Sequence, residues 1–190
     1  MAFRIRDNDH GYKELVKRVF AFGAPKITVG VHAKEGAEAH EGGPAGVTLA
    51  DVATWNEFGA GTTPERSFIR AWFDENQPRI KEAIRRLLTQ VIEGKISEDI
   101  ALERLGLWMQ GEIQKKIAAG IPPPNAARTI EKKGSDKPLV NTGQLRAGIT
   151  FEVEGPAGKR SADVSVTDVS GKQWDVKQRK SGSLGYKQKP

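Results

Sequence analysis

The sequence predicts an α+β fold in which a small antiparallel sheet of about three strands packs with two long helices. Two kinds of pattern predict it. Residues 27–32 and 149–153 alternate β-branched or apolar residues with small or polar ones, which is typical of strands. Residues 80–91 and 102–117 carry apolar residues at helical spacing, which indicates two amphipathic helices.

The composition favours one domain with exposed extensions. The chain has 190 residues, of which 37% are hydrophobic and 28% charged, so we expect a modest core. We predict a single domain at 1–170, with mobile loops at about 33–47 and 121–140, and a flexible basic tail at 171–190. That tail holds six basic residues and one acid, a net +5 of the +6 carried by the whole chain, so the rest is nearly neutral.

The expected strands are separated by glycine- and proline-bearing turns. A short helical pattern (Leu15, Val16, Val19 and Phe20) ends before Pro25, and the first strand, 27–32, follows it. The second strand is 149–153. We expect 162–166 to be its hairpin partner across a turn at 155–158.

Two helices are expected between the first strand and Pro78. Thr48 and Asp51 have the spacing of a capping box, so a helix begins there and ends before Gly59. Thr63 is expected to cap a second helix with Pro64 in its first turn.

Pro78 should kink or divide that second helix, and Ser97 should cap the last long one. Gly106 and Gly111 weaken the last helix by roughly 1 kcal/mol each unless another backbone packs closely against them. Core packing is expected for the first three tryptophans, which are Trp55, Trp72 and Trp108.

Little in the sequence indicates enzyme chemistry. There is no cysteine, which excludes disulfides, thiolate nucleophiles and cysteine-bound zinc. Neither a signal peptide nor a membrane-spanning run is visible, so we expect a soluble protein made in a cytoplasm. The residues of a conceivable metal site are His32, Glu35, Glu38, His40 and Glu41. Their spacing does not match known metal-ligand patterns, so we favour a solvated acidic loop. We therefore expect no enzyme activity and no cofactor; a hydrolase or nuclease would need an acidic metal cluster that the sequence does not display.

Two separated segments share a pattern with a known family. The first runs Ala53-Thr54-Trp55-Asn56-Glu57-Phe58-Gly59, then a Gly/Thr linker, then Pro64-Glu65-Arg66-Ser67-Phe68-Ile69-Arg70 and Phe73-Asp74-Glu75. The second runs Pro138-Leu139-Val140-Asn141-Thr142-Gly143-Gln144-Leu145-Arg146 and precedes the strand 149–153. In this order they resemble the neck, tail-completion and virion-morphogenesis proteins of tailed bacteriophages, over residues 27 to about 154.

The resemblance implies a structural virion protein at the head–tail junction, as neck or collar, tail completion or tail terminator. It would assemble in the host bacterial cytoplasm as a ring of six or twelve copies around the DNA channel, with heterologous contacts between copies. Its other partners would be portal or adaptor, gateway, and tail-tube or sheath proteins, with no membrane contact.

The matched residues are the candidate subunit-interface or fold-motif positions. Glu57 could pair with Arg66 or Arg70 across the linker, and Thr142 could cap the turn that holds Arg146. The full set is Asn56, Glu57, Phe58, Gly59, Pro64, Arg66, Phe68, Arg70, Thr142, Gly143, Leu145 and Arg146.

The basic tail supplies a second set of candidates, which could contact DNA without sequence preference or a partner protein. For its tryptophan we favour docking on a neighbouring subunit over stacking on a base. The candidates are Lys172, Trp174, Lys177, Arg179 and Lys180. The alternative function is therefore a small DNA-binding or packaging accessory protein that acts through this tail.

Overall fold

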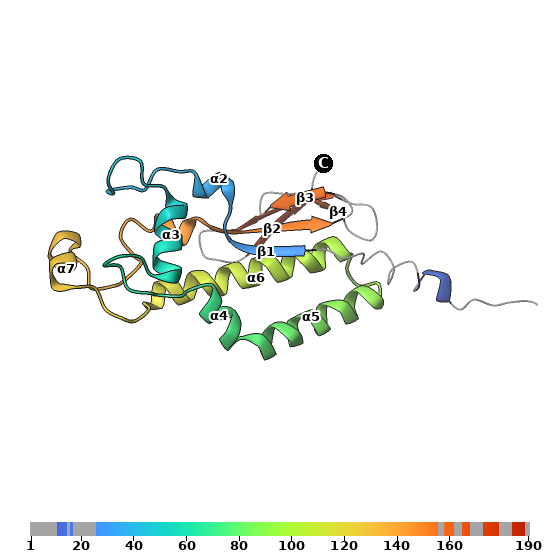
Figure 1. Ribbon diagram of the computed structural model, residues 1–190. Helices are drawn as coiled ribbons and strands as arrows, with labels where there is room; N and C mark the ends of the chain where they lie inside the picture. The colour runs from blue at the N-terminus through green and yellow to red at the C-terminus, as the bar shows by residue number, and fades with distance from the viewer. Residues whose placement is uncertain are drawn as a thin grey trace, which may run out of the picture.

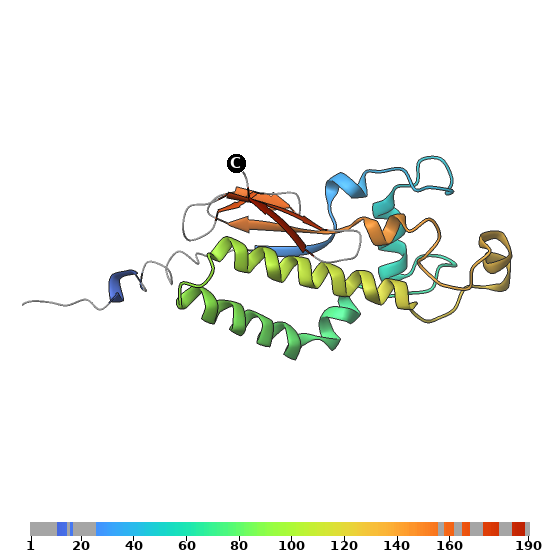
Figure 2. The same ribbon diagram turned by 180° about the vertical axis from the view of Figure 1, so that it is seen from behind.

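The predicted α+β architecture is present in the structure, a computed structural model. It describes residues 11–14, 16, 26–155, 158–161, 165–167, 173–178 and 184–188. In Figures 1 and 2 a sheet covers one side of the long helix α6 (Glu98–Ala119), and the helix α5 (Gln77–Ile92) lies along its other side. None of the helices in these residues combines the length and hydropathy that a membrane crossing needs.

The sheet that covers α6 is antiparallel and has the order β1-β2-β3, where β1 is Lys26–Val31, β2 is Ile149–Gly155 and β3 is Gly158–Ser161. Val29 of β1 lies opposite Phe151 of β2. Phe151 and Val153, two residues apart, are both buried and packed with apolar residues of α6. The strand alternation of the sequence therefore does direct one apolar face toward the helix.

The predicted hairpin partner of β2 is wrong in position. Gly155 pairs with Gly158, so only two residues lie between the strands, and β3 begins four residues before the expected strand at 162–166. Two residues suffice for a hairpin connection. The later residues Ser165–Thr167 form β4, which belongs to a second sheet.

The tail expected to be flexible contains two strands, and that expectation is corrected. β5 (Gln173–Gln178) pairs antiparallel with β4 and with β6 (Leu184–Gln188), so the boundary expected at residue 170 falls inside this second sheet. Trp174 and Val176 alternate with polar residues, which is a strand pattern. The many lysine, glutamine and serine residues around it conceal that pattern.

The two long helices are confirmed, including the break before α5. A short helix, α4 (Arg70–Glu75), ends just before α5, and Pro78 occupies the first turn of α5. The hydroxyl of Ser97 accepts a hydrogen bond from the backbone N–H of Ile100, as a cap of α6 should.

The structure shows why position 106 is a glycine: an aromatic ring packs against it, where we expected the close approach of another backbone. A Cβ at this position of α6 would lie 2.3 Å from Cδ2 of Phe151, so the absence of a side chain lets the ring lie against the helix. Gly111 differs, because nothing lies within 4 Å of a Cβ there.

Two of the three tryptophans expected in the core are packed there. Trp72 is buried, and its ring meets that of the partly buried Trp108 edge-on at 5.9 Å. Trp55 is 40% exposed on α3 (Leu49–Phe58), so its core assignment is wrong. Position 55 lies on the side of α3 away from the buried residues Leu49, Ala53 and Glu57.

The segment 33–47 is more ordered than expected. It begins with the helical turn α2 (Ala33–Gly36) and then folds back on itself, so that Ala39 forms a bridge with Thr48. The backbone N–H of His40 donates to the carbonyl of Val47 over 2.9 Å. A glycine-rich sequence predicts mobility because it has few side chains to bury, but here backbone hydrogen bonds join its two arms.

The segment 121–140 also contains structure that was not predicted. Its first residue, Ile121, is buried in the core, and α7 (Ala127–Lys133) lies in its middle. In Figure 1 this segment and the loop after α2 lie at the same end of the molecule. At the N-terminus, residues 12–14 and 16 are helical, as the pattern there predicts, and the rest of that predicted helix lies outside the described residues.

Candidate functional site

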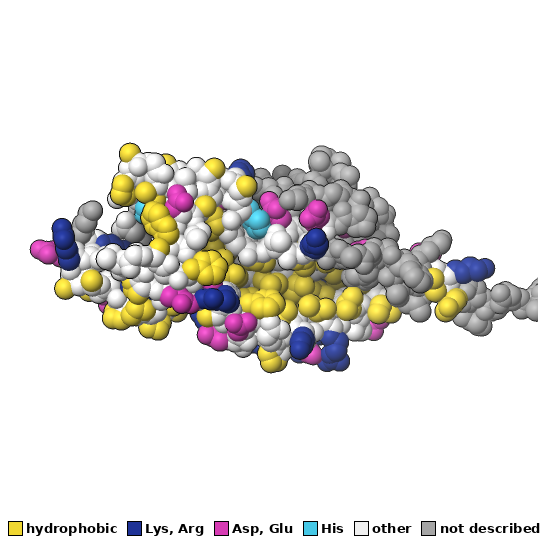
Figure 3. Space-filling view, viewed as in Figure 1, with side chains coloured by type: hydrophobic (Ala, Val, Ile, Leu, Met, Phe, Trp, Pro, Cys, Tyr) yellow, Lys and Arg dark blue, Asp and Glu magenta, His cyan; other side chains and the backbone are white. Residues whose placement is uncertain are grey.

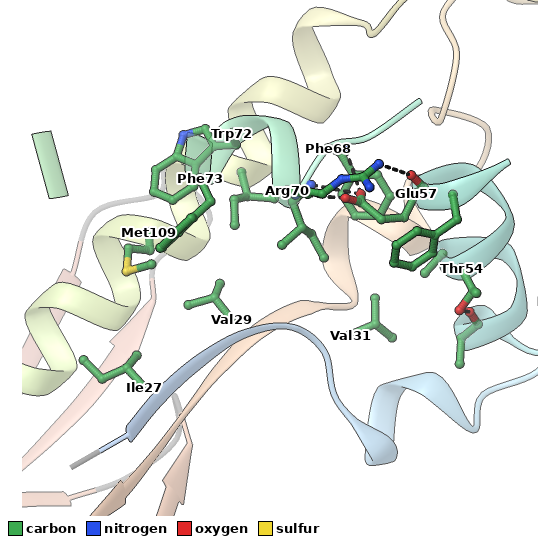
Figure 4. A pocket seen from close by; sticks show the side chains of 15 residues that line it. Ile27, Val29, Val31, Thr54, Glu57, Phe68, Arg70, Trp72, Phe73 and Met109 are labelled. Carbon is green, nitrogen blue, oxygen red and sulfur yellow. Dashed lines mark hydrogen bonds between the residues drawn. The ribbon is translucent and has the colours of Figure 1, made fainter. Parts of the chain in front are cut away.

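The carboxylate of Glu57 is the centre of the first motif. Glu57 lies in the last turn of α3 and is only 6% exposed. Its two oxygens accept hydrogen bonds from the backbone N–H groups of Phe68, Ile69 and Arg70, at 2.8, 3.0 and 2.9 Å. The hydroxyl of Ser67 donates a fourth, at 2.7 Å. One side chain of α3 therefore binds the backbone at the start of α4, and Figure 4 shows the two helices joined there.

This arrangement explains why the helix predicted to begin at Thr63 begins at Arg70 instead. Residues 64–69 pass the end of α3 without forming a helix, and Thr63 pairs with Ala60 in a tight turn. The first N–H groups of a helix have no partner within it, and a carboxylate is a strong acceptor for them. Here the cap comes from another helix, so the local capping pattern was misleading.

The ion pair expected between Glu57 and Arg66 or Arg70 is also wrong. The Glu57 carboxylate is used by backbone groups, and Arg66 points to the opposite segment of the chain. Its Nε donates to the carbonyl of Pro123 over 2.8 Å, and its Nη2 to that of Pro124 over 3.2 Å. Arg66 is 7% exposed, and burial lowers its pKa. It therefore fixes the start of the 121–140 segment to the linker between α3 and α4.

A second cation, Lys133, lies within the segment 121–140 itself. Nζ of Lys133 in α7 donates to the carbonyl of Lys137 over 2.6 Å. Burial is the larger cause that lowers the pKa of Lys133, and repulsion from Arg66 is the next. Both side chains therefore bind backbone carbonyls of the segment 121–140.

Arg70 lies at the surface of the motif. Its guanidinium pairs with Glu65 and lies 5.4 Å from the centre of the Phe58 ring. Phe58 itself is 61% exposed. Arg70 and Phe58 thus form part of an accessible surface, whereas Glu57 and Arg66 are buried.

The remaining matched residues of the first segment shape the turn. The carbonyl of Asn56 accepts a hydrogen bond from the backbone N–H of Arg66. Gly59 has a φ of 75°, and a Cβ there would lie 3.2 Å from the backbone nitrogen of Glu65, so both conformation and space favour glycine. Pro64 is exposed, and Phe68 is fully buried.

The second motif forms the short helix α8 (Gln144–Ala147), which packs against α3. The hydroxyl of Thr142 accepts a hydrogen bond from the backbone N–H of Gln144 over 3.3 Å, but the cap position of α8 is Gly143, which has no side chain to cap the helix. Gly143 takes a left-handed conformation, Leu145 is buried, and Arg146 is exposed. The predicted residues are therefore a turn, a core anchor and a surface cation.

Gln144, between the predicted residues, was not singled out from the sequence. Its side-chain amide donates to the carbonyl of Ala39 over 2.9 Å and accepts from the backbone N–H of Glu41 over 3.0 Å. It thereby ties the second motif to the loop after α2. A polar residue between two motif positions was its only signal in the sequence.

An apolar groove opens beside the first motif. Its volume is about 480 Å³, and we call it the apolar groove. Figure 4 shows it between β1, α3, α4 and α6, with Glu57 and Arg70 at one end. The lining residues are Ile27, Val29, Val31, Ala50, Ala53, Thr54, Glu57, Phe58, Phe68, Ile69, Arg70, Trp72, Phe73, Met109 and Ile113.

The described part of the chain shows no metal-binding cluster. No three histidine or acidic side chains there are grouped as metal ligands. His32 is held by two hydroxyls, with Thr28 at 2.9 Å from its Nε2 and Thr150 at 2.8 Å from its Nδ1. That environment orients the imidazole structurally within the sheet.

The basic candidates near the C-terminus are only partly located. Trp174 and Lys177 belong to β5, where they lie opposite Val166 and Gly185 of the neighbouring strands. Lys172, Arg179 and Lys180 lie outside the described residues.

Comparison of the chain with protein-family models, curated proteins and solved structures finds no match.

Proposed function

We propose that this chain is a structural protein of a tailed-bacteriophage virion and acts at the head–tail junction as one subunit of a ring. The observation that carries the proposal is the apolar groove beside the first motif. Its two ionisable residues, Glu57 and Arg70, bind groups of the chain itself, and most of its wall is apolar. Phe58 and Phe73 line this groove and are exposed, and exposed apolar surface of this kind is typical of a site where another polypeptide docks.

The motif residues support the same proposal. The residues that resemble neck and tail-completion proteins include a buried carboxylate and a buried arginine that bind the backbone, and an exposed arginine over an exposed phenylalanine. Buried backbone anchors maintain a fold, while exposed aromatic and arginine side chains are typical of interfaces. The proposed mechanism is thus assembly, without cofactor or reaction.

The test is a deletion of the gene in the phage that carries it, followed by electron microscopy of the particles. We expect filled heads and separate tails to accumulate, and the purified protein to restore joined particles and infectivity. Complete, normally joined virions without the protein would contradict the proposal.

A second candidate is a DNA-binding or packaging accessory protein, which the concentration of +5 in residues 171–190 favours. Deletion of this segment would remove β5 and β6, so charge substitutions make a cleaner test. Under this candidate, the variant with Lys177, Arg179 and Lys180 replaced by glutamine loses DNA affinity and has a shallower salt dependence. Affinity equal to that of the unmodified protein would exclude the candidate.

A further inference from the structure

The apolar groove leaves no charged group available to recognise a charged ligand. Glu57 accepts four hydrogen bonds from residues 67–70, and Arg70 pairs with Glu65. The hydroxyl of Thr54, another polar lining group, donates to the carbonyl of Ala50 over 2.8 Å. An occupant must therefore be recognised mainly by its apolar surface, which disfavours phosphate groups and the basic segment 171–190.

The groove is part of a larger apolar surface. Figure 3 shows hydrophobic side chains gathered in a band between the sheet and α5. Phe58 and Phe73 line the groove and are 61% and 42% exposed. Contiguous exposed apolar surface of this kind marks a docking site. In the sheet order, β1 is an edge strand, so the described residues place no strand on that side of it.

One segment of the chain has the matching chemistry. Leu15, Val16, Val19 and Phe20 recur at helical spacing, and the described part of this segment, residues 12–14 and 16, is helical. Tyr12, at the start of this segment, is 67% exposed.

Within one copy, the described part of this segment, residues 12–14 and 16, lies away from the groove. In Figures 1 and 2 its helical turn lies beyond the end of α5 and α6, away from α3 and α4. The apolar residues Leu15, Val16, Val19 and Phe20 and the apolar groove are different surfaces of one chain, so contact between them can join copies head to tail.

We propose that the apolar groove of one copy binds the N-terminal segment, residues 12–20, of a second copy. Such a heterologous contact repeats from copy to copy and closes into a ring where the rotation permits. The inference rests on the proposed function only for the closure of the ring; the contact itself follows from the groove and the segment.

The absence of cysteine from the chain allows a direct test. Leu15→Cys is made in one protein and Thr54→Cys in another, and the two are mixed under mild oxidation. Thr54 is an exposed residue of α3 that lines the groove. The matched control is Thr89→Cys on α5, also exposed, whose hydroxyl likewise donates to the carbonyl four residues earlier. We expect the disulfide between Leu15→Cys and Thr54→Cys to form on the order of a hundredfold faster than with the control, because a docked thiol has a millimolar effective concentration.

Equal rates with Thr54→Cys and Thr89→Cys would overturn the inference. So would a cross-link that forms within a single chain carrying both Leu15→Cys and Thr54→Cys but not between chains, because the occupant would then be the protein's own segment. Light scattering provides a second readout: Phe20→Ser should lower the assembled mass, whereas Lys17→Ser, on the polar side of the same helical pattern, should leave it unchanged. A monomeric unmodified protein at every concentration would also overturn it.

These outcomes separate the contact from the proposed function. If the cross-link forms but the deleted phage still makes joined virions, the junction role fails and the contact stands. If the deleted phage accumulates unjoined heads and tails but the cross-link fails, the junction role stands and another surface joins the copies.

Discussion

Replacement of Glu57 by alanine tests whether one buried carboxylate holds the start of α4. The substitution removes the acceptor of three backbone N–H groups and of the Ser67 hydroxyl. A buried donor without a partner costs about 1–3 kcal/mol. The N–H of Phe68 is in a buried position, whereas those of Ile69 and Arg70 are partly buried and can regain some hydration. We therefore expect Glu57→Ala to lower the free energy of unfolding by about 3–5 kcal/mol.

Urea unfolding followed by circular dichroism measures this effect. With a typical urea dependence of about 2 kcal/mol per molar, the midpoint should fall by about 2 M. Glu65→Gln is the matched control, because it also removes a carboxylate beside Arg70, but from an exposed ion pair. Such a pair contributes about 0–1 kcal/mol. If Glu57→Ala costs no more than Glu65→Gln, the carboxylate does not hold this segment and our reasoning is refuted.

Three further predictions follow from other contacts. Gly106→Ala should destabilise the protein by about 1–3 kcal/mol in urea unfolding, because its Cβ would overlap an aromatic ring, whereas Gly111→Ala should stabilise it by about 0.5–1 kcal/mol; equal effects would contradict the packing. Arg66→Ala should accelerate tryptic cleavage within 121–140, because two backbone carbonyls lose their donor, and an unchanged rate would show that this segment is held otherwise. Hydrogen bonds from Thr48, the N-cap of α3, lower the pKa of Asp51. The stability that Asp51 contributes is therefore present above its unfolded pKa of about 3.9 and is lost as the pH falls through the lower folded pKa. The Asp51→Asn variant should lose less stability between pH 6 and pH 3 than the unmodified protein.

The elements with local signals could be predicted from the sequence. The capping box at Thr48 and Asp51, the cap at Ser97 and the break at Pro78 all depend on groups within a few residues of one another. The strands at β1 and β2 follow from alternation along one chain segment. Such signals are complete in a short stretch of sequence.

The predictions that were wrong concern contacts between residues far apart in the sequence. The start of α4 is set by Glu57, more than ten residues earlier, and the segment after Ile121 by Arg66. Charge complementarity predicted that Glu57 would pair with Arg66 or with Arg70. Glu57 and Arg66 bind backbone groups instead, because leaving a buried carbonyl or N–H without a partner costs at least as much free energy as the ion pair would contribute.

The apolar groove escaped prediction for a different reason. Val29 and Val31 alternate as core residues should, and the periodicity of α6 places Met109 on its apolar side. A pattern identifies an apolar face, but it does not say whether another element of the same chain covers that face. Only the arrangement of β1, α3 and α4 shows that the groove is open.

The position of Glu57 connects the fold to the proposed docking. Its carboxylate fixes residues 67–70, and three of these, Phe68, Ile69 and Arg70, line the apolar groove. A change that keeps the protein folded but loosens this segment should therefore weaken docking of the N-terminal segment. Glu57→Gln retains one acceptor oxygen and replaces the other with a donor, so it should be the milder substitution.

In the background of the Leu15→Cys and Thr54→Cys pair, Glu57→Gln should slow disulfide formation between copies, whereas Glu65→Gln should not. The comparison is made where circular dichroism shows both variants to be folded. A rate unchanged by Glu57→Gln would mean that the groove keeps its shape without the carboxylate, and that Glu57 serves only stability. A reduced rate would mean that the buried part of the motif determines the shape of the surface on which copies meet.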